Sequence, residues 1–269
     1  MNVPQKAGAE AIPVVSPKVK MAQLQGNRMA VSIFFDKYDN QSKGLEAIRG
    51  DAESIQRVLG DERKFRYKFP SEENPTLFDS HQFENQGRLV STFEMFLEKW
   101  KRAQPAGMIV DSFLLYVHGH GAQVLGQQCV LTNKWTAIPI MELVNLVVRH
   151  VPSTRYYVIT DCCSNKKIGD EKAKKRVEET LKVEKPRNFR DKYVVVNAAP
   201  EGYTASAESE KTLTSALVKV LQTCLRKGEN GVPLRNLENL LREEQAKQGS
   251  SNFPTVVAPS MLMDELFPL

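Results

Sequence analysis

The sequence RYYVITDCCSN, Arg155 to Asn165, is the most informative part of this chain. Its first part, Arg155 to Thr160, has the aromatic and β-branched composition of a buried strand. An acid and two cysteines, Asp161 to Cys163, follow where that strand would reach the surface. A second apolar run, Ser112 to Val117, is followed in the same way by HGHGA, His118 to Ala122. Chemically reactive side chains therefore stand at the ends of two predicted core strands.

Other segments alternate between strand and helix patterns along the chain. Short apolar runs typical of buried strands occupy residues 29–35, 128–132, 192–199 and 252–258. Amphipathic patterns typical of helices occupy residues 44–60, 88–103, 139–151, 212–228 and 232–249. This alternation predicts an α/β fold with one mostly parallel central sheet covered by helices on both faces.

The composition excludes several classes of protein. Apolar residues make up 41% of the 269 residues, yet no apolar run approaches the about 18–20 residues of a membrane helix. The first residues lack the continuous apolar core of a secretory signal. The four cysteines show no small-domain disulfide framework. We therefore expect a cytoplasmic protein with reduced thiols and no membrane partner.

The chain divides into four parts by composition. Residues 1–27 predict a flexible leader, 28–163 the larger part of the domain, and 192–269 its smaller part. Between them, residues 164–191 carry ten Lys or Arg against six Asp or Glu. Because this segment mixes both charges and has a single aromatic residue, a solvated loop is favoured over a nucleic-acid site. We expect no nucleic-acid partner.

The two polar strand ends are predicted to meet. A strand–helix–strand crossover makes the two strands parallel, so their carboxyl ends lie at one edge of the sheet, where open α/β sheets build their sites. A cysteine there becomes a nucleophile as its thiolate, and a neighbouring imidazole can take the proton. Two other interpretations are a zinc site made of His118, His120 and the cysteines, and purely structural cysteines and histidines.

The period of a strand assigns sides to these residues. If the extended backbone persists, Asp161 and Cys163 point to one side and Cys162 to the other. His118 and His120 would share a side, although the glycine after each histidine allows the backbone to turn. A glycine beside the histidine also lets a backbone N–H approach a substrate carbonyl closely.

These motifs resemble those of the caspase and metacaspase family of cysteine proteases, and more closely those of metacaspases. YVHGHGAQ, residues 116–123, is similar to the metacaspase pattern Y-S-G-H-G. ITDCCSN, residues 159–165, resembles D-C-C-H-S-G. LEAIRGDAESIQRVL, residues 45–59, resembles the L-x-G-C-x-N-D-A block, and TLTSALVKVL, residues 212–221, resembles the helix of the small subunit.

The resemblance implies a cysteine endopeptidase acting on peptides and proteins through a thioester. His120 and Cys163 take the positions of the catalytic dyad. The backbone N–H groups of Gly121 and Cys163 take those of the oxyanion hole. One alternative is a catalytically inactive caspase-fold protein that acts by binding a partner, and another is a cysteine hydrolase of a different kind.

The resemblance also implies a substrate pocket. Asp51 and Asp161 align with its acids, and His118 stands at its wall where metacaspases have Ser. Two carboxylates favour Arg or Lys before the cut. A structural alternative for Asp51 is an acid at the start of a helix, stabilised by the helix dipole.

The resemblance finally bears on cofactors and processing. Residues 121–139 contain no acid, whereas calcium-dependent metacaspases carry an acid-rich loop there, so we expect no calcium activation and no other cofactor. In this family the segment after the catalytic strand is where chains are cut during activation. Lys167, Lys175 and Arg187 are candidate sites for such processing.

Overall fold

The computed structural model describes residues 27–38, 46–61, 63–69, 78–79, 86–164, 171–185, 189–200, 202–203, 205, 208, 210–250 and 253–268. The α-helices in these ranges are α1 (Glu46–Leu59), α2 (Gln86–Ala103), α3 (Ile140–His150), α4 (Glu171–Leu181), α5 (Leu213–Arg226) and α6 (Leu234–Lys247). The strands are β1 (Arg28–Phe34), β2 (Tyr67–Lys68), β3 (Phe78–Asp79), β4 (Val110–Gly119), β5 (Gly121–Val124), β6 (Gln127–Leu131), β7 (Ala137–Pro139), β8 (Ser153–Cys162), β9 (Tyr193–Asn197), β10 (Val232–Pro233), β11 (Thr255–Val257) and β12 (Leu266–Phe267).

The central sheet has the strand order β11-β9-β8-β4-β1-β2, and β3 pairs with β1 as well. Every pairing in it is parallel except that of β11 with β9. The α/β fold with a mostly parallel sheet is confirmed. Strands from before and after residues 164–191 share this sheet, since β9 pairs with β8. A small antiparallel sheet, β5-β6-β7, follows β4 in the chain.

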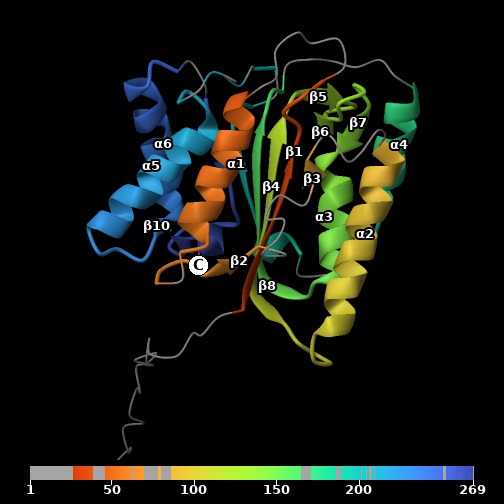
Figure 1. Cartoon of the computed structure of the whole chain (residues 1–269), viewed down its shortest axis with the longest axis horizontal. Coiled ribbons are helices and arrows are strands. Elements are labelled where there is room, and N and C mark those ends of the chain that lie inside the picture. Colours follow the sequence, from red (N-terminus) through yellow and green to blue (C-terminus); the bar gives the residue numbers. More distant parts are fainter. Residues whose placement is uncertain are drawn as a thin grey trace, which may run out of the picture.

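Two hydrophobic cores lie on opposite faces of this sheet. Helices α1, α5 and α6 cover one face and α2, α3 and α4 the other (Figure 1). The side chains of each strand alternate between them: Phe113 and Leu115 of β4 belong to the α2–α4 core, and Leu114 and Tyr116 to the α1–α5–α6 core. The same alternation sends the polar residues at the strand ends to defined faces.

Helix α4 differs from the solvated loop predicted for residues 164–191. Three of its side chains, Ala173, Val177 and Thr180, are buried at helical spacing against the rest of the domain. Arg176 also pairs with Glu142 of α3, through Nη2–Oε1 at 2.7 Å and Nε–Oε2 at 2.5 Å. The many Lys and Glu residues of the segment lie around this narrow apolar stripe, which is why composition alone predicted a loop.

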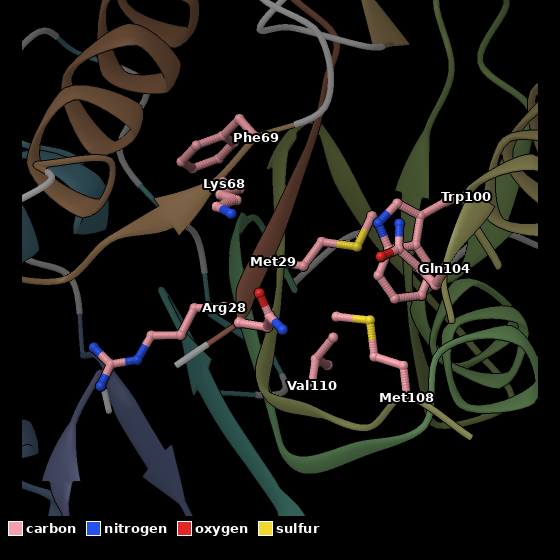
Figure 2. Close-up of a pocket in the computed structure, with 9 residues that line it drawn as sticks. Arg28, Met29, Lys68, Phe69, Trp100, Gln104, Met108 and Val110 are labelled. Atoms are coloured by element: carbon pink, nitrogen blue, oxygen red, sulfur yellow. The ribbon is translucent and has the colours of Figure 1, made fainter. Parts of the chain in front are cut away.

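A cavity of about 190 Å³ lies at the amino ends of β1 and β4 (Figure 2). Met29, Trp100 and Met108 line it, together with Lys68 and Arg28, whose side chain points away from these three (Figure 2). The carboxyl ends of the same strands, where the reactive residues stand, are at the other end of the sheet. In the part of the chain that the structure describes, no helix is long and apolar enough to cross a bilayer.

Candidate active site

The register of β4 and β8 brings the two polar strand ends together, as the sequence predicts. His118 pairs with Asp161, and Gly119 pairs with Cys162. Strand β4 ends at Gly119 and β8 at Cys162, so His120 and Cys163 are each the first residue beyond their strand.

Gly121 lies directly against the backbone of the second strand end. A Cβ at Gly121 would collide with the carbonyl oxygen of Cys163 and would stand 2.8 Å from the Cβ of Cys162. Any larger residue would separate the two segments. Glycine therefore allows the close approach that holds His120 and Cys163 on adjoining stretches of chain.

His120 is positioned by two aromatic residues that belong to none of the sequence motifs. The backbone N–H of His120 donates to the Tyr38 hydroxyl at 2.7 Å. Its imidazole stacks on Trp135, with ring centres 5.2 Å apart and planes at 22°, and its ring centre is 4.5 Å from that of Tyr38. Both aromatics follow the ends of strands and have no periodic pattern around them, so the sequence offered no signal for this contact.

The two histidines do not share a side, which corrects the extended-strand expectation. His118 is buried on the α1–α5–α6 face, beside Tyr116. His120 packs against Tyr38 and Trp135, which contact the other core. The backbone between them turns at Gly119, whose φ of +155° brings it against the Tyr38 hydroxyl.

Cys163 is half-buried, whereas Cys162 is fully buried. The Cys163 thiol lies 3.4 Å from the Ala205 carbonyl oxygen, to which it donates. The next residue, Ser164, donates its N–H to the Tyr203 carbonyl at 3.0 Å, which fixes the chain after the cysteine. Burial raises the pKa of the Cys163 thiol, and the Asp161 carboxylate acts in the same direction. The resting form is therefore the protonated thiol, and a base must take its proton.

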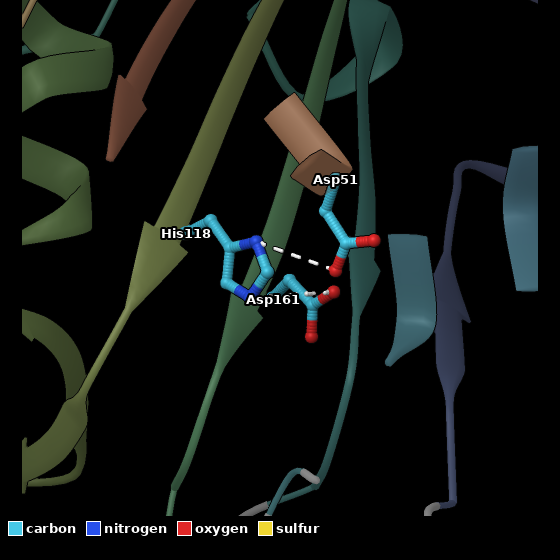
Figure 3. A group of neighbouring side chains, drawn as sticks. All are labelled: Asp51, His118 and Asp161. Atoms are coloured by element: carbon cyan, nitrogen blue, oxygen red, sulfur yellow. Dashed lines mark ion pairs between the residues drawn. The ribbon is translucent and has the colours of Figure 1, made fainter. Parts of the chain in front are cut away.

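Behind the strand ends, His118 lies between two carboxyl groups (Figure 3). Its Nδ1 is 4.0 Å from Asp51 Oδ2, and its Nε2 is 3.8 Å from Asp161 Oδ2. Burial and the neighbouring Asp161 charge raise the pKa of Asp51 from its ordinary 3.8 to about 7. Burial lowers the pKa of His118, while the charge of Asp161 opposes that shift.

A chain of hydrogen bonds fixes the tautomer of His118. The Thr214 hydroxyl donates to Asp161 Oδ2 at 2.7 Å, and the Thr214 N–H donates to the same oxygen at 2.8 Å. The Tyr116 hydroxyl lies 2.9 Å from Thr214 Oγ1 and 2.7 Å from His118 Nδ1. Since the one Thr214 hydroxyl proton goes to Asp161 Oδ2, Tyr116 donates to Thr214, and His118 donates Nδ1–H to Tyr116. The other ring nitrogen, Nε2, then carries a lone pair.

A cavity of about 500 Å³ opens beside Asp51, between α1 and α5. Glu210, Lys219 and Gln222 also line it. The Asp51 side chain is 12% exposed, but that of Asp161 is 0% exposed, so the cavity reaches only the first of the two predicted pocket acids. Asp51 lies in the second turn of α1, so the helix-start alternative is wrong for it.

Of the three predicted processing sites, the structure describes one. Lys175 lies on α4 with an exposed side chain, whereas Lys167 and Arg187 lie outside the described residues.

Among the described residues, the groups that could hold a metal ion contain neither His120 nor a cysteine. The zinc site of histidines and cysteines considered from the sequence is therefore wrong for these residues.

Residues 27–263 match the family model of the Caspase domain. The chain belongs to this family. Its caspase-domain fold is similar to that of caspase-1 from Spodoptera frugiperda, with a TM-score of 0.56, 12% identity, and coverage of 88% of this chain and 90% of that chain.

Two further solved structures resemble this caspase-domain chain. The Drosophila initiator caspase Dronc has a TM-score of 0.53, 11% identity, and coverage of 99% of this chain and 96% of that chain. A protein of Geobacter sulfurreducens has a TM-score of 0.57, 15% identity, and coverage of 90% and 98%. At these identities the likeness shows the fold alone. Among curated proteins, no sequence matches this chain.

The exposure of the thiols predicts which cysteine reacts. Iodoacetamide should modify Cys163 first, because Cys129, Cys162 and Cys224 are buried. Labelling should accelerate with pH into the alkaline range, since burial raises the pKa of Cys163. Mass spectrometry of the native protein checks this, with Cys163→Ala as the control. Equal labelling of Cys162 would contradict the geometry.

The raised pKa of Asp51 predicts a pH-dependent gain in stability for Asp51→Asn. The folded state keeps the Asp51 proton to a higher pH than the unfolded state, so wild type loses stability between about pH 4 and 7. With chelator present, the variant should be more stable than wild type by about 1–2 kcal/mol at pH 8 and nearly equal at pH 4. Denaturant unfolding at both pH values measures this. Glu98→Gln, a change at a partly exposed acid on α2, should show no such pH trend. If Asp51→Asn were less stable than wild type at pH 8, the raised pKa of Asp51 would be disproved.

Proposed function

We propose that this caspase-domain chain is a cysteine endopeptidase with Cys163 as nucleophile and His120 as general base. The observation that supports this most directly is the contact of Gly121 with the Cys163 backbone, which keeps the residues His120 and Cys163 on adjoining stretches of chain. A half-buried thiol between two buried residues, Cys162 and Ser164, also fits a positioned nucleophile.

The reaction begins with a proton transfer because the pKa of the Cys163 thiol is raised. His120 takes the thiol proton as sulfur bonds to the scissile carbonyl carbon, and the carbonyl oxygen becomes an oxyanion. Backbone N–H groups of Gly121 and Cys163 stabilise that charge, on the order of 3 kcal/mol for each donor. The C–N bond then breaks, and His120 gives its proton to the leaving amine.

Hydrolysis of the thioester completes the cycle. Water attacks the acyl carbon while His120 takes a proton from it, and the S–C bond breaks to restore the Cys163 thiol. Both steps need the imidazole to keep its orientation. The stacking of the His120 ring on Trp135, and the hydrogen bond from the His120 backbone N–H to the Tyr38 hydroxyl, supply that constraint.

The proposed specificity is for Arg or Lys before the cut, as in metacaspases. The cavity beside Asp51 supports this, because Asp51 and Glu210 face it while Lys219 is its one cation among the described lining residues. A guanidinium pairs with such carboxylates through planar hydrogen bonds, and an ammonium through its point charge. Asp161 does not line this cavity but adds negative charge behind it, in the buried cluster with His118.

Peptide cleavage tests the proposed activity. Wild-type protein should hydrolyse fluorogenic peptides ending in Arg or Lys, whereas Cys163→Ala and His120→Ala should lose at least about 100-fold in kcat/KM. Cys224→Ala, the same substitution at a buried cysteine of α5 outside the proposed site, serves as the matched control. Cleavage after Asp alone would disprove the basic pocket but keep the dyad. Full activity in both dyad variants would disprove the mechanism. Absence of turnover in the wild-type protein would favour the inactive, partner-binding alternative.

We also propose that the chain cuts itself within residues 164–191. Lys175 lies inside α4, and a helical backbone must unfold before a protease can bind it in extended form. Cleavage should therefore occur after Lys167 or Arg187, on either side of that helix, and more slowly after Lys175. Intact-mass measurement of wild type and Cys163→Ala checks this. Fragments that also form in the variant would show an outside protease.

A further inference from the structure

We propose that Asp51, His118 and Asp161 form a binding site for a divalent metal ion of the Zn²⁺ type. The three residues come from α1, β4 and β8, and one ligand atom from each lies within 4.8 Å of the other two. Their side chains converge behind the strand ends (Figure 3). This site is separate from the dyad, since it includes neither His120 nor Cys163.

The cluster brings acceptor atoms of Asp51, His118 and Asp161 close to one another. Asp161 Oδ1 and Asp51 Oδ2 are buried and have no hydrogen-bond partner among the described residues. The hydrogen-bond chain through Tyr116 leaves His118 Nε2 with a lone pair that faces Asp161. Two buried carboxylate oxygens without a hydrogen-bond donor are costly unless a proton or a metal ion compensates them.

The environment of His118 is that of a metal ligand. Metal-binding histidines donate their second ring N–H to a protein oxygen, which fixes the tautomer and the ring orientation. Here His118 Nδ1–H donates to Tyr116, which is held in turn by Thr214. Thr214 also fixes Asp161 through two hydrogen bonds to one oxygen, leaving the other oxygen free for an ion.

The burial of the cluster favours a small ion over the head of a basic side chain. His118 is 2% exposed and the Asp161 side chain 0% exposed, so a guanidinium in the cavity beside Asp51 would not reach them. A single ion can enter past Asp51, the one partly exposed member. The fourth position of a tetrahedral ion would then face the cavity.

The types of ligand select the metal. One imidazole and two carboxylates suit Zn²⁺, whereas Ca²⁺ takes six to eight oxygens and Mg²⁺ keeps several waters. Bonds of about 2.0–2.1 Å would place tetrahedral ligand atoms about 3.3 Å apart. His118 Nε2 lies 3.8 Å from Asp161 Oδ2, so the Asp161 carboxylate, whose Oδ1 has no hydrogen-bond partner among the described residues, is within reach of an ion bound to His118.

A second cluster provides an internal contrast. Glu94, Glu98 and His150 also lie close enough to share an ion. Their carboxylates already have cationic partners, with Arg149 3.0 Å from Glu94 and Arg102 3.2 Å from Glu98. They are also partly exposed, so their charges remain hydrated. The buried cluster, with unpartnered oxygens, is the site that an ion would stabilise more.

An ion at this site would regulate the proposed protease. It would neutralise Asp51 and Asp161 and so weaken the attraction of the neighbouring cavity for Arg or Lys. This consequence rests on the proposed function. The binding of the ion does not, because it can be measured in Cys163→Ala, which cannot turn over substrate.

Calorimetric titration of Cys163→Ala with ZnCl₂, after removal of metals by chelator, tests the site. This background removes the accessible thiol. We expect one equivalent of Zn²⁺ to bind, and affinity to fall at least about tenfold in His118→Ser and in Asp51→Asn. His150→Gln, the matched change in the second cluster, should leave the affinity unchanged. If His118→Ser does not fold, Asp51→Asn decides the result.

The absorption of bound Co²⁺ identifies the ligands independently. A site made of His118 and two carboxylates predicts a tetrahedral Co²⁺ spectrum without a thiolate charge-transfer band. A thiolate band would assign the ion to the buried cysteines and overturn the proposal. Absence of Zn²⁺ binding, or affinity that is the same in His118→Ser and Asp51→Asn as in the parent, would also overturn it.

Discussion

The pairing register of β4 with β8 is the constraint on which the rest of this structure depends. It places His118 opposite Asp161 and Gly119 opposite Cys162. A shift of one residue would move every side chain of one strand to the other face of the sheet. The two cores enforce the register, because apolar residues alternate between them along both strands. The stability of the core and the geometry of the site are thus consequences of one pairing.

The strand ends separate two kinds of chemistry by face. Toward α1 and α5, the chain buries His118 with Asp51 and Asp161, an arrangement that costs folding free energy unless a proton or an ion compensates it. At the sheet edge, His120 and Cys163 stay partly accessible. The glycine between the two histidines makes this division possible, since its backbone conformation turns the chain out of the strand.

Much of this could be predicted from the sequence. Strands β1, β4, β8, β9 and β11 are predictable because buried strands are continuous apolar runs, and α1, α2, α3, α5 and α6 because each has one apolar face. The two-residue strands β2 and β3 are too short to carry such a pattern. The meeting of the His-Gly and Asp-Cys-Cys motifs followed from the handedness and direction of a crossover. Helix α4 was missed because its apolar stripe is narrow and its other residues are charged.

The details that the sequence could not provide depend on contacts between distant segments. Tyr38 reaches His120 from the end of β1, and Thr214 reaches Asp161 from α5. The depth at which Asp161 is buried depends on the packing of α5 against the sheet. None of these contacts produces a recognisable pattern in the sequence, whereas the strand ends do, because polar residues follow an apolar run there.

The most direct test of the central claim is covalent labelling of the nucleophile by peptide-based inhibitors. Matched peptidyl chloromethyl ketones ending in Arg or Asp would be incubated with wild-type protein, and the modified residue identified by mass spectrometry. The account predicts an adduct on Cys163 that forms faster with the arginyl compound and is lost in His120→Ala. An adduct on another cysteine, or faster reaction of the aspartyl compound, would contradict it.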